Sequence, residues 1–191
     1  MKRMIALLML LIMVLSLTAC GNGGRNDSEK HGYYKGFEWG LSRDAVSEKL
    51  QEDGLELVEN LGLLDISKFN IQKPCFTVGF DGDITCYNVK FLDKYNPWFI
   101  SFNFDKDKLA EVSIQLDGYY SVEDYEAIKA ELGKKLGEII NKDDELGLLM
   151  NMHTAEWKTD VSDVSLNYTE GTVGKGMISI TYDELAYHEK K

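Results

Sequence analysis

Apolar and polar side chains alternate from Trp98 to Leu116, and this alternation constrains the fold more than any other feature of the sequence. A polar turn, Asp105-Lys106-Asp107-Lys108, divides the stretch in two. A period of two predicts two long antiparallel strands with one buried face and one wet face. The apolar positions of the series are Trp98, Ile100, Phe102, Phe104, Val112, Ile114 and Leu116.

Two helices are predicted from their capping residues. Ser42 is the predicted N-cap of a helix over residues 43–50, which ends near Asp53-Gly54. Ser121 begins a second helix with Asp124 as its capping-box partner, and Gly137 is the predicted stop.

Further strands are predicted at residues 75–79, 84–92, 152–158, 161–168 and 177–182. The first two flank a hairpin signal at Asp81-Gly82. Residues 141–146 are interpreted as a charged loop, and residues 55–73 hold at most one irregular strand. Because the order of helix and then strands occurs twice, we predict an α+β fold: one antiparallel sheet with two helices on one face, in a doubled helix-plus-meander layout.

The beginning of the chain has the pattern of an export signal. Lys2 and Arg3 precede an apolar run of 12 residues from Met4 to Leu15, whereas a helix that spans a bilayer needs about 20. The segment Leu17-Thr18-Ala19-Cys20 resembles the lipobox of bacterial lipoproteins. This resemblance implies that cleavage leaves Cys20 as an acylated N-terminus on the outer face of a membrane. The alternative is a secreted protein with an incidental cysteine near its cleavage site.

These features predict the organisation of the chain. Residues 1–19 are the signal peptide, 20–32 the acylated cysteine with a Gly-rich tether, 33–185 a single domain with halves of about 33–118 and 119–185, and 186–191 a disordered tail.

The charge of the chain restricts its partners. The net charge is −11, and removing Lys2 and Arg3 with the leader leaves 19 cations against 32 anions, or −13. Such a charge repels phosphate backbones, so we expect no nucleic-acid partner. It also gives no attraction to anionic lipid, so we expect membrane contact through the Cys20 anchor.

The segment from Phe37 to Val46 (FEWGLSRDAV) resembles the helix start of small lipoproteins of the outer-membrane-assembly (SmpA/OmlA) type. The doubled layout is similar to the β-lactamase-inhibitor-protein fold. The long insert from Leu55 to Lys73 departs from both families, and no functional residue carries over from either.

Cys75 and Cys86 are the thiols that remain after Cys20, and export permits them to form a disulfide. The alternative is two reduced cysteines that pack as small apolar groups. No metal site is expected, because His31, His153 and His188 lack partners at ligand spacing, and the acidic clusters fit turns and solvated loops. No cofactor motif and no nucleophile motif is present in the sequence.

Aromatic side chains at the ends of the predicted elements are candidates for an interaction surface, namely Tyr33, Tyr34, Trp98, Tyr119 and Tyr120. The alternative is that they cap the ends of the core.

Taken together, the sequence predicts a lipid-anchored extracytoplasmic binding module without catalytic activity, whose partner is another envelope protein. An inhibitor or sensor of an extracellular enzyme and a small-ligand-binding or hydrolase domain are the alternatives.

Overall fold

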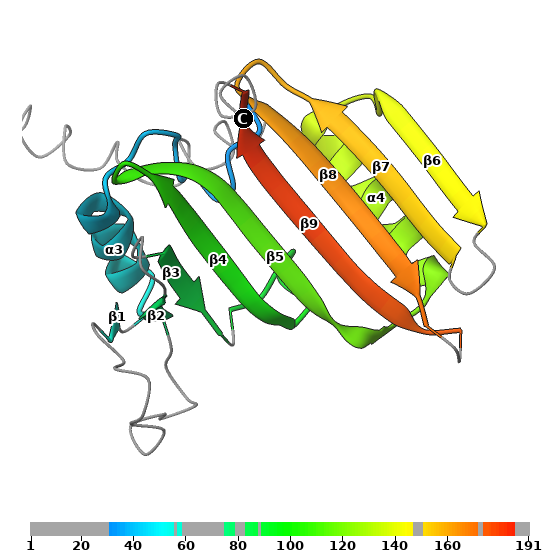
Figure 1. Ribbon diagram of the computed structural model, residues 1–191, viewed down its shortest axis with the longest axis horizontal. Helices are drawn as coiled ribbons and strands as arrows, with labels where there is room; N and C mark the ends of the chain where they lie inside the picture. The colour runs from blue at the N-terminus through cyan, green and yellow to red at the C-terminus, as the bar shows by residue number, and fades with distance from the viewer. Residues whose placement is uncertain are drawn as a thin grey trace, which may run out of the picture.

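The computed structural model describes residues 31–55, 57–58, 75–78, 83–87, 89–146, 151–171 and 174–185. These residues form one large sheet with two α-helices packed on it, as Figure 1 shows. The helices are α3 (Arg43–Glu52) and α4 (Val122–Leu136). The strands are β1 (Leu57–Val58), β2 (Cys75–Val78), β3 (Asp83–Cys86), β4 (Pro97–Asp105), β5 (Lys108–Tyr120), β6 (Asn141–Leu146), β7 (Asn151–Lys158), β8 (Ser162–Glu170) and β9 (Gly176–Glu184).

The nine strands described form a single sheet in the order β1-β2-β3-β4-β5-β9-β8-β7-β6. Every pair is antiparallel except β1 and β2. In each half a helix is followed by a meander, and the last strands of the two halves, β5 and β9, pair at the centre of the sheet. The predicted α+β class and doubled layout are therefore confirmed.

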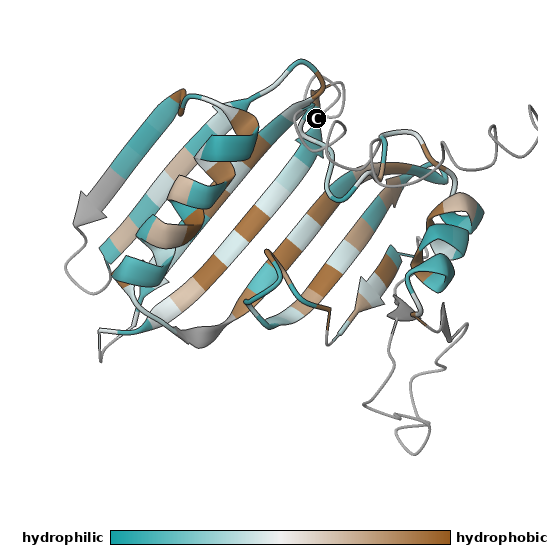
Figure 2. Cartoon of the chain, turned by 180° about the vertical axis from the view of Figure 1, so that it is seen from behind, coloured by the Kyte–Doolittle hydropathy of each residue, from teal (hydrophilic) through white to brown (hydrophobic). Residues whose placement is uncertain are grey.

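One face of the sheet carries the core, and the alternation predicted from Ile100 to Leu116 explains why. Trp98, predicted at a buried position of the same series, is 64% exposed, because the register of β4 against β5 shifts between Pro97 and Phe99. Ile114 on β5 lies opposite Ile100 on β4 and Ile180 on β9, so the apolar positions of neighbouring strands align in rows. Figure 2 shows these rows as brown bands that repeat across the central strands, beside α4. The buried side chains of the helices that pack onto this face are Val46, Leu50, Tyr125, Ile128 and Leu132.

The predicted caps and turn are confirmed in detail. The Ser42 hydroxyl accepts a hydrogen bond from the amide of Ala45, and Ser121 forms a capping box with Asp124. Lys106 and Asp107 have φ values of 49° and 64°, which fits a two-residue turn of the hairpin type between β4 and β5.

Two predicted elements are wrong. Residues 141–146 form strand β6 and not a loop, because backbone pairing with β7 holds an edge strand without any need for alternating apolar side chains. The strand predicted to continue to Leu92 ends at Cys86, and the chain then turns at Leu92 and Asp93, where φ is 48° and 59°. Most of the ambiguous stretch 55–73 lies outside the described residues, and so do Asp81-Gly82 and the predicted tail.

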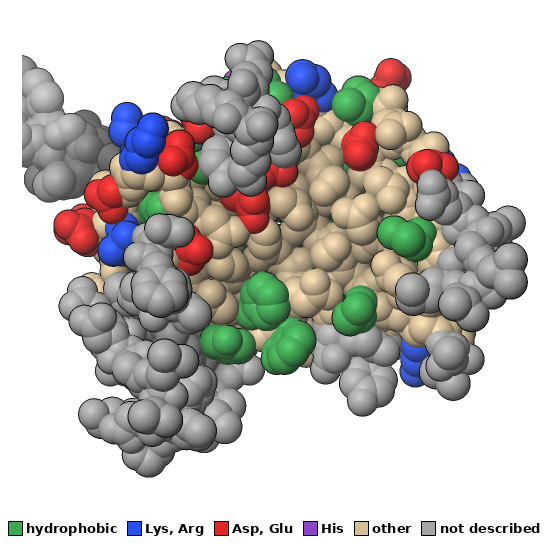
Figure 3. Space-filling model, in the orientation of Figure 1, with side chains coloured by type: hydrophobic (Ala, Val, Ile, Leu, Met, Phe, Trp, Pro, Cys, Tyr) green, Lys and Arg blue, Asp and Glu red, His purple; other side chains and the backbone are tan. Residues whose placement is uncertain are grey.

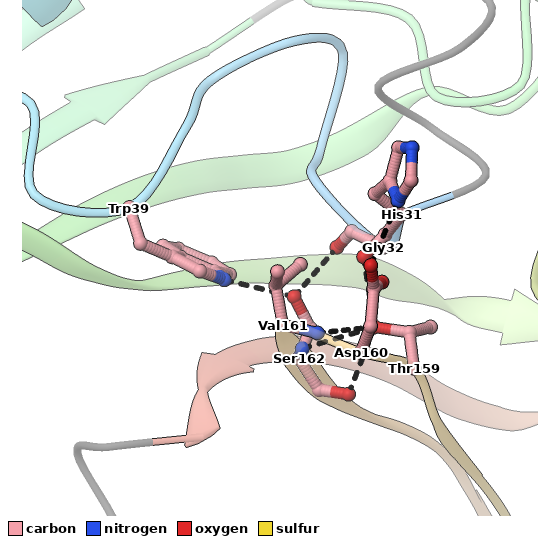
Figure 4. A network of polar contacts seen from close by, with 7 residues as sticks. All are labelled: His31, Gly32, Trp39, Thr159, Asp160, Val161 and Ser162. Carbon is pink, nitrogen blue, oxygen red and sulfur yellow. Dashed lines mark hydrogen bonds and ion pairs between the residues drawn. The ribbon is translucent and has the colours of Figure 1, made fainter.

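The first described residues, His31 and Gly32, are held onto the turn between β7 and β8 by a polar network, drawn in Figure 4. Ser162, which is fully buried, donates to the carbonyl of Gly32 (3.0 Å) and accepts from the Trp39 indole (2.8 Å). Thr159 donates to the His31 carbonyl (2.8 Å), and the His31 ring lies 2.9 Å from Asp160. The packed domain therefore includes His31 and Gly32, two residues that we assigned to the tether.

This network predicts that replacing Gly32 lowers the free energy of unfolding. Its φ is +89°, and an added Cβ would lie 2.5 Å from the Thr159 hydroxyl. Gly40 is a matched control, because its φ is +81° but nothing lies within 4 Å of an added Cβ. Gly40→Ala is expected to lower the free energy of unfolding by about 1 kcal/mol through backbone strain alone. Gly32→Ala is expected to lose about 1–3 kcal/mol more through overpacking. Urea unfolding of both variants measures the difference, and equal losses would show that Thr159 does not restrict this position.

Candidate functional site

The face of the sheet opposite the helices is the candidate site, and we call it the open face. It consists of the polar positions of the alternating strands, which are all half-buried. Registered pairing places Ser113, Thr181 and Ser165 in one row across β5, β9 and β8. The residues of the open face are Thr85, Ser101, Asn103, Glu111, Ser113, Gln115, Thr154, Glu156, Asp163, Ser165, Asn167, Ser179, Thr181 and Asp183.

Hydrogen bonds between side chains order much of this face. Asn103 and Ser113 both donate to the same Glu111 oxygen, each at 2.6 Å, and Ser101 donates to Asn103 at 2.8 Å. Farther across the sheet, Thr154 donates to Asn167 at 3.0 Å. Side chains that already have partners lose little freedom when a ligand covers them. The open face is therefore preorganised.

Charge is concentrated at one end of the open face. Glu111 lies directly opposite Asp183, and Asp183 lies directly opposite Asp163. The Lys158 ammonium lies 3.7 Å from Asp163, at the end of this row. Like charges in directly opposed strand positions destabilise each other. A cationic group placed over the row would therefore be bound favourably.

Exposed apolar side chains lie at the other end. Met152 and Met177 both lie opposite Thr169, in one row across β7, β8 and β9, and their exposed fractions are 41% and 53%. Trp98, 64% exposed, is the second residue of β4 at the same end, and its ring centre lies 5.9 Å from that of Phe99. Figure 3 shows hydrophobic side chains gathered toward this end of the face and acidic ones toward the other.

The aromatic residues predicted as an interaction surface differ in how exposed they are. Trp98 is exposed, and Tyr33 is half-buried against Trp39. Tyr34 is only 4% exposed and belongs to the core. Tyr120 packs against the core, its hydroxyl donating to the Asn96 carbonyl at 3.4 Å. The side chain of Tyr119 lies outside the described residues. Of the four whose side chains are described, Trp98 alone therefore enters the candidate site as an exposed ring.

The remaining predicted residues lie elsewhere. Cys20 and His188 are outside the described residues. Cys86 is disulfide-bonded, and the residue in register with it across β2 and β3 is Cys75, whose side chain is outside the described part. The Cys75–Cys86 bridge stays a prediction that fits this register.

His153 lies on the helix-covered side of β7, with its ring 5.7 Å from that of Tyr125 and 5.8 Å from that of Tyr168. Burial raises the pKa of the Tyr168 hydroxyl, and the charge of Glu170 adds to this effect. The pKa of Tyr33 is raised by burial and then by Glu38 and Asp160. Both shifts favour the neutral phenol and do not activate it as a base.

The described residues lack two kinds of functional element. They contain no grouping of three or more His, Cys, Asp and Glu side chains that could hold a metal ion. Neither of the helices in the described part is long and apolar enough to cross a membrane.

The sequence predicted a wet face of the sheet but assigned none of its polar residues to a site. The polar positions of the alternating strands mark this face directly, whereas the predicted interaction residues were aromatic side chains at the ends of elements. Ser162 and Thr159 carry no such signal, because their importance comes from contacts more than 120 positions away.

Comparison with known proteins gives no relationship for this chain: no family model, no curated protein and no solved structure matches it. The resemblances drawn from the lipobox, the segment 37–46 and the doubled layout therefore stay predictions.

Proposed function

We propose that this protein is a lipid-anchored extracytoplasmic module that binds another protein of the cell envelope through its open face. One observation carries the proposal: a preorganised polar sheet face lies opposite both described helices, with an acidic row at one end and exposed apolar side chains at the other.

The two ends of the face favour a protein partner of defined chemistry. Trp and Met are enriched at the centres of protein interfaces, so Trp98 and Met177 are the expected apolar anchors. The row of Glu111, Asp183 and Asp163 favours a partner that carries basic side chains, which would be steered toward it. The partner therefore presents an apolar pocket and a basic strip on one surface.

The point at which the N-terminus is held supports an anchored orientation. The network around Ser162 and Thr159 fixes His31 at the end of the sheet that carries the acidic row, because Ser162 lies opposite Glu184. From Cys20 to His31 the chain advances 11 residues, which reach at most about 36–40 Å when extended. A lipid on Cys20 would hold the acidic end near the bilayer and leave Trp98 at the distal end.

The experiment is an affinity capture from detergent-solubilised membranes of the producing organism, with the acylated protein as bait. Thr181 lies at the centre of the open face, between Ser113 and Ser165, so Thr181→Arg places a large cation there. Ala130→Arg adds the same group on the exposed surface of α4 and is the matched control.

We expect the wild type and Ala130→Arg to recover the same partner in equal amounts, and Thr181→Arg to recover at least about tenfold less, which corresponds to about 1.4 kcal/mol. Equal recovery by both variants, or no partner at all with intact acylated bait, would contradict the proposal. If the captured partner is an enzyme that loses activity in the complex, the module is an inhibitor that uses this same face.

A further inference from the structure

A second site lies on the opposite side of the sheet, in the space between α3 and the core face of β3 and β4. A cavity of about 300 Å³ opens there to solvent. Its walls are buried apolar side chains from the N-terminal segment, α3, β3 and β4. They include Tyr34, Phe37, Leu50, Cys86, Ile100 and Phe102.

Two charges of opposite sign stand among the described residues that line this cavity, Lys35 and Asp53. Lys35 is held in place, since its ammonium donates to the Lys90 carbonyl at 3.0 Å and lies 5.7 Å from the Tyr34 ring centre. Lys49 adds a second positive charge nearby, because its ammonium donates to the Gly36 carbonyl at 3.1 Å and lies over the Phe37 ring. This side of the cavity therefore favours an anionic group.

The charge of opposite sign, Asp53, follows Lys49 by one helical turn and favours a cationic group. Asp53 is the C-cap residue of α3, so its carboxylate stands at the negative end of the helix dipole. A ligand with both charges would place its cation at Asp53 and its anion toward Lys35 and Lys49, with its apolar part on the buried walls.

The volume limits the apolar part. Small-molecule sites range from about 300 to 1,000 Å³, so this cavity is at the lower limit. It suits one or two apolar side chains and not a long acyl chain. We propose that the cavity binds a small zwitterion with an apolar body, of which an apolar dipeptide is the simplest example.

This proposal does not depend on the proposed function. The cavity opens on the helix-covered side of the sheet, whereas the open face lies on the other side. Either site could fail in its own test while the other is retained.

The experiment is calorimetric titration of the protein with the dipeptide Leu-Phe, its N-acetyl derivative and its C-terminal amide. We expect a single site for Leu-Phe, with at least about tenfold weaker binding of each blocked form to the wild type. In the Asp53→Asn variant, N-acetyl-Leu-Phe is expected to bind as well as Leu-Phe, while the amide still binds more weakly. In the Lys35→Met variant, the amide is expected to bind as well as Leu-Phe, while the N-acetyl form still binds more weakly. Val89→Trp, at a half-buried wall residue, fills the cavity and is expected to abolish binding, while Thr181→Arg on the open face leaves it unchanged.

Thermal unfolding of each variant checks that loss of binding is not loss of fold. The proposal is overturned if Leu-Phe gives no saturable heat with the wild type, or if a folded Val89→Trp variant binds as well as the wild type. A lysophosphatidylethanolamine, which carries both charges on a lipid, is titrated in parallel. Tighter binding of this lipid than of the dipeptide would contradict the size argument.

Discussion

Replacing Trp157 with Ala is expected to lower the free energy of unfolding by about 3–5 kcal/mol. Trp157 is fully buried and is the largest of the fully buried side chains in the described part. It lies on β7 opposite Val164, and its indole nitrogen faces Gly133 on α4, 4.0 Å from where a Cβ on that glycine would stand. Removing the ring opens a cavity between helix and sheet that the rigid strands cannot close. Because domains of this size are stable by about 5–15 kcal/mol, the loss is a large part of the total.

Trp98 provides a matched control for this measurement. The same substitution at Trp98, which is 64% exposed, is expected to change the free energy of unfolding by no more than about 0.5 kcal/mol. Urea unfolding of Trp157→Ala, Trp98→Ala and the wild type gives both values. A loss below about 1 kcal/mol for Trp157→Ala would mean that α4 is not packed on β7 and β8 as described.

Replacing Cys20 with Ala is expected to move the protein almost completely from the membrane to the soluble fraction. The acyl chains implied by the lipobox each contribute about 0.8 kcal/mol per buried methylene, so two chains hold a domain firmly. The remaining chain has a net charge of −13 by the count given above, and such a charge is not attracted to an anionic bilayer. No second source of membrane affinity is therefore expected.

Detergent phase partition with mass spectrometry of the N-terminal peptide measures this effect. Cys75→Ala removes the predicted disulfide partner of Cys86, far along the chain from the lipobox, and is expected to leave the protein in the detergent phase. A wild-type protein found in the aqueous phase with an unmodified Cys20 would refute the anchor. A Cys20→Ala variant that stays in the detergent phase would show that another part of the chain binds lipid.

Local signals in the sequence were sufficient where one short segment determines one element. The alternation around Ile100 and Ile114 predicted β4 and β5, and Ser121 with Asp124 predicted the start of α4. These features depend on neighbours in the chain, so spacing alone reveals them.

Other features depend on contacts between distant segments, and spacing does not reveal those. Residues 141–146 form an edge strand whose charged side chains need no buried face, so no alternation marks it. Tyr34 stands next to Tyr33 without any period, yet its ring reaches those of Phe102 and Tyr182 and is buried. The cavity beside α3 combines residues from Tyr34 to Phe102, and only the folded chain brings them together.

Site-specific photocrosslinking in intact cells tests the central claim most directly, because it reports which face of the anchored protein touches its partner. A photoreactive amino acid is placed at Ser179, in the middle of the open face, or at Ala127, on the exposed surface of α4. We predict one discrete crosslinked protein from position 179 and none from position 127. Crosslinks from position 127 with none from position 179 would place the interaction surface on the helices and contradict the account.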